Sequence, residues 1–157
     1  MIERIVTGGQ TGAEQGAWRA ARRAGIATGG YMPRGFQTEA GPAPGLGQLH
    51  GAVEFPFDDA RRVRANLRRA DALLWFGDPE SAEAREAFEA CQELSRPWYV
   101  VDVGFTPPGK AAGWLEVFQI GVLVVSGDRE SARPGVAAAA ESFLGQTLRA
   151  LGRRAGR

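Results

Sequence analysis

The chain has 157 residues, of which 44% are hydrophobic and 24% are charged, and its formal net charge is +1. This length and balance predict one globular domain and exclude a disordered or fibrous chain. The near-neutral charge excludes a global attraction to nucleic acid or to an acidic membrane surface, so we expect neither as a partner.

Strand-like and helix-like patterns alternate along the chain. Short apolar runs predict strands, and apolar residues at helical spacing predict helices. The predicted strands cover residues 2–6, 26–32, 53–57, 72–76, 98–103 and 121–125. The predicted helices cover residues 13–24, 59–70, 79–94, 114–118 and 134–151. Gly25 is expected to close the first helix, Asp58 or Asp59 to cap the second, Asp78 to cap the third, and Gly152 to follow the last.

This alternation predicts the α/β class, with a single Rossmann-like, doubly wound, mostly parallel sheet and helices on both faces. The continuous apolar run at residues 72–76 is typical of a parallel strand that is covered on both sides. We expect residues 1–152 to form one ligand-binding domain and residues 153–157 to form a basic C-terminal tail.

The turn after the first predicted strand is the strongest candidate site. Ligands of such sheets bind outside the carboxyl ends of the strands. This turn is rich in glycine and opens a helix, where free backbone N–H groups and the helix dipole favour an anion. The sequence therefore predicts a phosphate cradle, with a simple tight turn as the alternative; its residues are Gly8, Gly9, Gln10, Thr11 and Gly12.

Residues 33–51 show neither a strand nor a helix period, and a loop of that length is usually functional or disordered. We interpret it as a ligand-covering loop. Glu39 within it could accept paired N–H groups from a purine or pterin ring, and Tyr31 could stack on that ring. Gly29 and Gly30, just before the loop, are candidate ligand-binding glycines or ordinary turn glycines.

Two further positions are candidates for binding the anion. Arg62 and Asn66 are four residues apart and share one side of a helix, where Arg62 can reach a phosphate or pair with a buried acid. After the last strand, Gly127 and Arg129 stand on the predicted rim, and Arg129 could neutralise an oxyanion. The alternative for that segment is helix capping by Asp128 or Ser131.

No residue pattern demands catalysis or a metal ion. His50 is expected on the surface, and Cys91, the single cysteine, is expected in the core rather than in a disulfide. The arginine clusters at residues 61–69 and 149–157 are interpreted as solvated. With no signal segment and no apolar run of membrane-spanning length, we expect a cytoplasmic protein.

Several segments taken together resemble the family of putative molybdenum cofactor carriers over nearly the whole chain. They are Val6–Ala13, Gly29–Pro33, Glu39–Gly41 and Gly127–Ser131, with the pair Arg62 and Asn66. The resemblance implies a Rossmann-type sheet related to the LOG and DprA-like nucleotide-binding superfamily, often assembled as a dimer or tetramer. It also implies the molybdenum cofactor as ligand, that is, molybdopterin, a pterin with a phosphate monoester, or its metal-loaded form.

The chain departs from the family pattern at several places. Glu14 and Gln15 replace the family's acid and arginine, Tyr31 and Met32 its tryptophan and cysteine, Phe36 an arginine, and Val124 an asparagine. Residues 77–81 replace a glycine-glycine-threonine turn and bring acids to where a second phosphate would approach. Positive charge has therefore been lost at the site.

The leading hypothesis is a non-catalytic binding or carrier protein for molybdopterin or for another phosphorylated ligand such as a nucleotide. One alternative is a LOG-like phosphoribohydrolase, which cleaves nucleotide N-glycosidic bonds. Another alternative is a nucleotide-sensing module whose partner reads loop closure.

Overall fold

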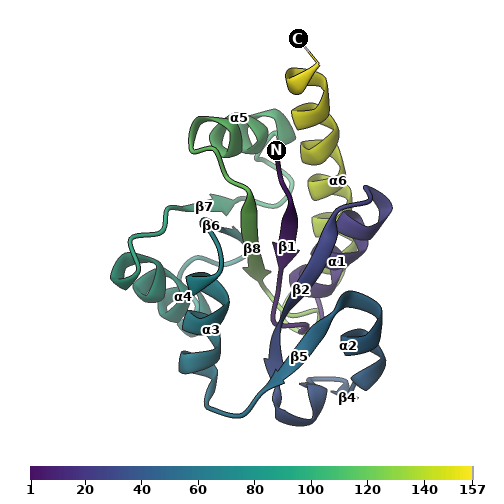
Figure 1. Cartoon of the computed structure of the whole chain (residues 1–157), viewed down its shortest axis with the longest axis vertical. Helices are drawn as coiled ribbons and strands as arrows, with labels where there is room; N and C mark the ends of the chain where they lie inside the picture. Colours follow the sequence, from purple (N-terminus) through teal and green to yellow (C-terminus); the bar gives the residue numbers. More distant parts are fainter. Residues whose placement is uncertain (157) are drawn as a thin grey trace.

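The strands of the sheet run parallel to one another and the helices pack on its two faces (Figure 1). A computed structural model describes residues 1–156, and within this range six parallel strands follow the order β5-β2-β1-β8-β6-β7. Their bounds are Arg4–Val6 for β1, Ala27–Pro33 for β2, Ala52–Phe55 for β5, Ala72–Phe76 for β6, Trp98–Val101 for β7 and Val122–Gly127 for β8.

All the helices of residues 1–156 except α2 form two layers on the sheet. The bounds are Ala13–Arg23 for α1, Pro44–His50 for α2, Asp59–Arg68 for α3, Ala82–Glu93 for α4, Pro108–Val117 for α5 and Val136–Ala155 for α6. One core packs α1, α5 and α6 against one face of the sheet, and a second core packs α3 and α4 against the other. These observations confirm the predicted α/β, Rossmann-like fold with helices on both faces.

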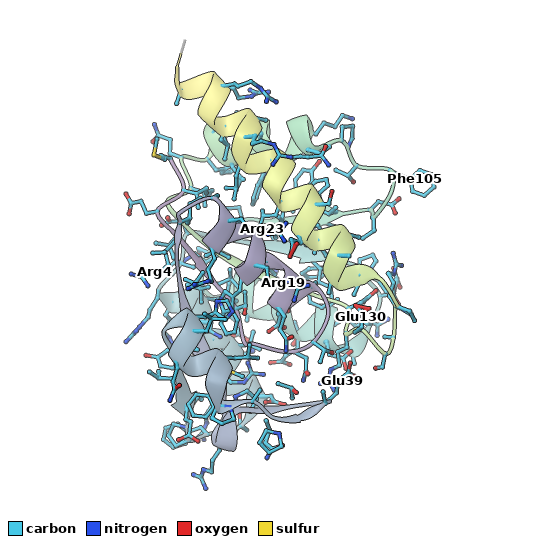
Figure 2. The ribbon with its side chains drawn as sticks, turned by 90° about the vertical axis from the view of Figure 1, so that its right-hand side faces the viewer. Arg4, Arg19, Arg23, Glu39, Phe105 and Glu130 are labelled. Carbon is cyan, nitrogen blue, oxygen red and sulfur yellow. The ribbon has the colours of Figure 1, made fainter. Side chains whose placement is uncertain are left out.

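Helices α1 and α6 are also joined by charge. Arg19 and Arg23 of α1 point toward α6 in Figure 2 and pair with Glu141 at 2.7 and 3.6 Å. Gly16 lies where the two helices cross, because a Cβ at this position would collide with the Ala137 carbonyl. The long last helix is thereby fixed against the first one.

The last strand, β8, lies between β1 and β6. The turns that follow β1, β6 and β8 are therefore neighbours at the carboxyl edge of the sheet, although they are far apart in the sequence. This arrangement creates the rim on which a site is expected.

One predicted helix start and one alternative for a helix cap are wrong. Helix α4 begins after Ser81, whose hydroxyl accepts from Ala84 N–H at 3.1 Å, and not at Asp78. Helix α6 is capped by neither Asp128 nor Ser131. The Glu130 carboxylate accepts the N–H groups of Gly135 and Ala137 at 2.6 and 3.0 Å, and these bonds lower the pKa of Glu130.

The predicted end of the last helix is also wrong. Helix α6 continues through Gly152 to Ala155, and Arg154 in its last turn reaches Glu116 of α5 at 3.4 Å. Packing on α5, which is itself longer than predicted, keeps these residues helical. Arg153 and Arg154 of the expected tail are therefore part of α6, whereas Arg157 lies outside the described residues. In residues 1–156, no helix combines the length and the apolar character that a membrane crossing requires.

Residues 33–51 are ordered rather than loop-like. They form a 3-10 turn at Arg34–Phe36, an antiparallel pair of short strands, β3 (Gln37–Thr38) and β4 (Gly41–Pro42), and helix α2. Helix α2 buries His50, which is 3% exposed and stacks on Trp18 with ring centroids 4.4 Å apart, so the predicted surface position is wrong. Cys91 is buried as predicted, and burial raises the pKa of its thiol to about 12.

Candidate functional site

A cavity of about 760 Å³ lies at the carboxyl ends of β1, β6 and β8, on the side of the sheet that carries α3 and α4. Its volume is in the range of natural small-molecule sites. Apolar side chains from α3 and the strands, Val63, Leu67, Trp75 and Val124 among them, form part of its wall. Six of the predicted site residues line it: Gly8, Gln10, Arg62, Asn66, Gly127 and Arg129.

Several backbone N–H groups of the glycine-rich turn already have hydrogen-bond acceptors within the protein. Gly9 N–H donates to the Thr7 hydroxyl at 3.0 Å, and Thr11 N–H donates to the Gln10 side-chain oxygen at 3.1 Å. Ala13 N–H donates to the Asp128 carbonyl at 3.2 Å. The prediction that these amides are free for an anion is therefore wrong, because side chains of the turn and the segment after β8 already supply acceptors.

Glu14 brings a carboxylate into the place expected for the anion. It stands in the first turn of α1 and lines the cavity. One oxygen accepts a long bond from Gln10 N–H at 3.4 Å, and the other accepts from the Ser126 hydroxyl at 2.9 Å. A negative side chain at a helix N-terminus is favoured by the helix dipole. The cavity therefore contains a carboxylate that the sequence motif reading did not assign to the site.

Arg62 lies across the glycine-rich turn. A Cβ at Gly8 would collide with its guanidinium and would also lie 2.7 Å from Glu14 Oε1, so a larger residue here would displace both side chains. The guanidinium donates to Asp59 at 3.3 and 3.4 Å and to the Tyr31 carbonyl at 3.4 Å, all of which are long bonds. Its side chain is 14% exposed. Arg62 is thus held at the cavity wall by weak contacts.

Asn66 supports the backbone of β2. Its side-chain oxygen accepts from Tyr31 N–H at 2.8 Å and its NH₂ donates to the Tyr31 carbonyl at 3.3 Å. The Tyr31 ring packs against Phe55 and beneath Arg69 instead of standing in the cavity. Tyr31, which the sequence suggested could stack on a ligand ring, therefore does not line this cavity.

Glu39 lies outside the cavity and joins separate segments of the chain by hydrogen bonds. It stands between β3 and β4, where its carboxylate accepts from the hydroxyl groups of Thr11 and Ser131 and from Ser131 N–H. Its own N–H donates to the Gln10 side chain at 2.8 Å. The bonds from Ser131 and Thr11 lower the pKa of Glu39. Figure 2 shows Glu39 below Glu130, at the edge where these segments meet.

Two of the predicted glycines, Gly12 and Gly30, pack against the backbone of another segment, and two others lie against side chains. At Gly30 a Cβ would collide with the Thr7 carbonyl, and at Gly12 it would collide with the Asp128 carbonyl. Gly9 faces the Met32 side chain, and the Gly29 carbonyl accepts from the Trp18 indole at 3.1 Å. These glycines, together with Thr11 and Glu39, build the rim and do not line the cavity.

The segment after β8 carries two arginines into the cavity wall. Arg129 is exposed and, in the part of the chain described, forms no ion pair, whereas Arg133 pairs with Asp128 at 3.2 Å. Gly127 is required because a Cβ there would collide with the Phe76 carbonyl. Across residues 1–156 no cluster of histidine, cysteine and acidic side chains is arranged to hold a metal ion.

Sequence reasoning missed Glu14, Asp128 and Arg133 as cavity residues. Glu14 was visible as an acid in the first turn of a predicted helix, next to the glycine motif. Asp128 and Arg133 follow the last strand, but their direction depends on a turn and a helix cap that were predicted wrongly. Only the position of Glu14 carried a usable signal.

Comparisons with known proteins agree with this architecture. A sequence model of the family described as "Circularly permutated YpsA SLOG family" matches residues 5–148. The crystal structure of a "putative molybdenum carrier protein" from Syntrophus aciditrophicus SB is similar, with a TM-score of 0.84 and 25% sequence identity. That similarity covers 94% of this chain and 95% of the other. No curated protein sequence matches this chain.

Proposed function

Because this chain belongs to the circularly permutated YpsA SLOG family, we propose that it binds a small ligand that carries one phosphate and a nitrogen-rich ring. The observation that carries the proposal is the 760 Å³ cavity on the carboxyl edge of the sheet, which combines an apolar wall, arginines and an inward carboxylate. Such a combination suits a ligand with an anionic end and a flat ring. The match also agrees with the family resemblance predicted from the sequence motifs.

In this proposal the phosphate lies between Arg62 and Arg129. Arg62 makes long bonds to its protein partners, so it can turn toward an anion at little cost. Arg129 is exposed and forms no ion pair within residues 1–156, so its guanidinium can pair with an anion. Bidentate guanidinium groups match phosphate geometry. Gly8 keeps the turn open beneath Arg62.

The ring lies on the apolar wall with its N–H edge toward Glu14. The carboxylate of Glu14 has lone pairs beyond those that Gln10 and Ser126 use. A guanine or a pterin presents two adjacent N–H donors that suit a carboxylate, whereas adenine does not. This assigns to Glu14 the role that the sequence suggested for Glu39.

Molybdopterin is the ligand that we favour, with guanine nucleotides as the next class. The similar protein from Syntrophus aciditrophicus SB is named a "putative molybdenum carrier protein". The residues fit the organic part of that ligand: Arg62 and Arg129 suit its phosphate, and Glu14 suits its pterin edge. Molybdenum would be cargo, carried on the pterin.

Calorimetry with GMP, AMP and a pterin monophosphate tests this assignment. We expect binding of GMP and of the pterin, weaker binding of AMP, and a loss of about 10- to 100-fold in affinity in Arg62→Ala. Arg61→Ala, a change at an exposed neighbour, is the matched control and should bind normally. Glu14→Gln should remove the preference for GMP over AMP. If Arg62→Ala and Arg61→Ala bind equally well, the site is misassigned.

Native mass spectrometry of freshly purified protein adds an independent observation. A retained adduct with the mass of a phosphorylated pterin would support the proposal directly. An adduct whose composition lacks phosphorus would contradict it.

A second candidate function is nucleotide N-glycosidic hydrolysis, as in LOG relatives. The observation that favours it is Glu14, a carboxylate in the cavity that could act on a ribose or on an attacking water. Incubation with AMP and an assay for free adenine separates the two functions. Efficient release that is lost in Glu14→Gln would replace the carrier proposal.

The same proposal includes a homo-oligomer, either dimer or tetramer, located in the cytoplasm and without nucleic acid as partner. It follows from the family resemblance and from the near-neutral charge of the chain. A ligand-sensing role, in which a partner reads closure of the rim, is compatible with this assembly.

A further inference from the structure

Asp128 holds its carboxylate in the turn that follows β6. Both of its oxygens accept the Asp78 N–H at 3.2 Å, and one of them pairs with Arg133 at 3.2 Å. Its side chain is 11% exposed. Gly77 has a φ of +131°, and a Cβ at this glycine would collide with the Asp128 carboxylate. The turn after β6 is therefore in close contact with the carboxylate of Asp128.

The partners of this carboxylate are those that a phosphate group uses. A backbone N–H in a glycine turn after a parallel strand and a guanidinium are both common donors to phosphate oxygens. In this chain Asp128 accepts the Asp78 N–H and pairs with the Nε of Arg133. The surrounding end of the cavity is also acidic, since Asp78, Glu83 and Glu86 line it.

This acidic end lies next to the arginine that we assign to the ligand's phosphate. Arg129 directly follows Asp128, and the Asp128 carbonyl accepts from Ala13 N–H at the start of α1. A phosphate between Arg62 and Arg129 would therefore have the Asp128 carboxylate as a neighbour. A second phosphate attached to the first one would extend toward a like charge that already holds the Asp78 N–H and the Nε of Arg133.

We propose that Asp128 restricts the ligand of this site to a single phosphate, so that the protein binds monophosphates and rejects the corresponding diphosphates. The inference rests on the proposed function, because it presumes an anionic ligand in this cavity. It goes beyond that function by naming the residue that sets the ligand's phosphate number. The mechanism is exclusion: like charges repel, and the Asp78 N–H and the Nε of Arg133 already face the Asp128 carboxylate.

Calorimetric titration with GMP and GDP tests the inference on the intact chain. In the wild type we expect GDP to bind at least about 10-fold more weakly than GMP. In Asp128→Ala, which releases Asp78 N–H and Arg133, the two affinities should come within about threefold of each other. Glu83→Gln is the matched control, because it removes one negative charge from the same end of the cavity without releasing those two donors.

Two results would overturn the inference while the binding function stands. One is wild-type protein that binds GDP as tightly as GMP. The other is Glu83→Gln relieving the discrimination as much as Asp128→Ala, since the effect would then be general charge and not occupation of the donors.

A second pair of probes separates this inference from the proposed function. Inorganic pyrophosphate needs no ring site, and we expect Asp128→Ala to bind it at least about 10-fold more tightly than the wild type does. If neither GMP nor the pterin binds but this gain is seen, the proposed ligand class fails and the role of Asp128 survives. If no gain is seen, the role of Asp128 fails. Asp128→Asn keeps an acceptor for Asp78 N–H and shows whether any loss of fold, followed by circular dichroism, accounts for the results.

Discussion

Gly30 and Gly127 each lie where two backbones come into contact at the rim of the sheet. Gly30 has a φ of +139° and its α-carbon faces the Thr7 carbonyl, while Gly127 faces the Phe76 carbonyl. Glycine is required at both positions because any Cβ would collide with those carbonyl oxygens. A glycine motif leaves open whether the missing side chain makes room for a ligand or for the neighbouring strand, and here it is the strand.

His50 gives a prediction at the scale of one residue. Burial, together with the charges of Arg22 and Arg19, lowers its pKa from 6.5 to about 4, and its Nδ1 has no hydrogen-bond partner within residues 1–156. The folded protein thus keeps His50 neutral at pH values where the unfolded chain would protonate it. Stability is therefore expected to fall as the pH drops from about 6.5 toward 4.

His50→Phe should keep the stacking on Trp18 and remove this titration. Between pH 7 and pH 4.5 the variant should lose about 2 kcal/mol less free energy of unfolding than the wild type, allowing for solvent screening of the two exposed arginines. Urea unfolding at both pH values provides the measurement, and the acidic groups cancel because both proteins contain them. Equal losses in the two proteins would show that His50 is not the group responsible.

At the scale of elements, the β3–β4 hairpin joins three segments that are distant in the sequence. Glu39 at its tip binds Thr11 in the turn after β1 and Ser131 in the segment after β8. The contact exists while Glu39 is ionised. Because its folded pKa is lowered, the stabilisation is present above the unfolded pKa and is lost as the pH falls through the folded pKa.

Glu39→Ala should release the hairpin without unfolding the protein. We expect amide hydrogen exchange in residues 37–41, and at Ser131, to be about tenfold faster or more, with little change in the melting temperature, because the hairpin lies outside the main cores. Glu89→Ala, a change at an exposed acid on α4, is the control. Unchanged exchange in Glu39→Ala would mean that other contacts hold the hairpin closed.

At the scale of the whole molecule, the position of β8 decides where a ligand can bind. Since β8 lies between β1 and β6, it brings the turns after all three strands to one edge and places Ser126, Asp128 and Arg129 in the cavity. The sheet beneath is a packed core on both faces, which gives the rim a rigid base.

A substitution at Leu74 tests how much the packed core beneath the rim contributes to the stability of the protein. It is fully buried near the middle of β6, within the core formed with α1, α5 and α6. Leu74→Ala should lower the free energy of unfolding by about 2–5 kcal/mol through lost burial and a residual cavity. Val117→Ala, at a position that is 78% exposed, should change it by about 0.5 kcal/mol or less. Denaturant unfolding monitors both variants, and comparable losses would contradict the assigned packing.

Much of the architecture is determined locally. The apolar run Ala72–Phe76 and the alanine stripe of α1 predicted their elements correctly, because hydrophobic periodicity reports directly which face of an element is buried. The elements within residues 33–51 were not predicted, because they are too short to show a hydrophobic period and are held by contacts with distant segments. The cap predicted at Asp78 and the alternative cap at Asp128 were wrong for a related reason, namely that the Ser81 and Glu130 side chains accept the N–H groups at these helix starts.

The sequence by itself determined the parallel α/β fold, the family, and the edge of the sheet at which a site is expected. Only the tertiary structure decided which polar groups face the cavity, because a donor or acceptor is available to a ligand only when no other segment has already bound it. The N–H groups of Gly9 and Thr11 and the carboxylate of Glu39 are hydrogen-bonded to other groups of the protein. Arg62 and Glu14, in contrast, line the cavity.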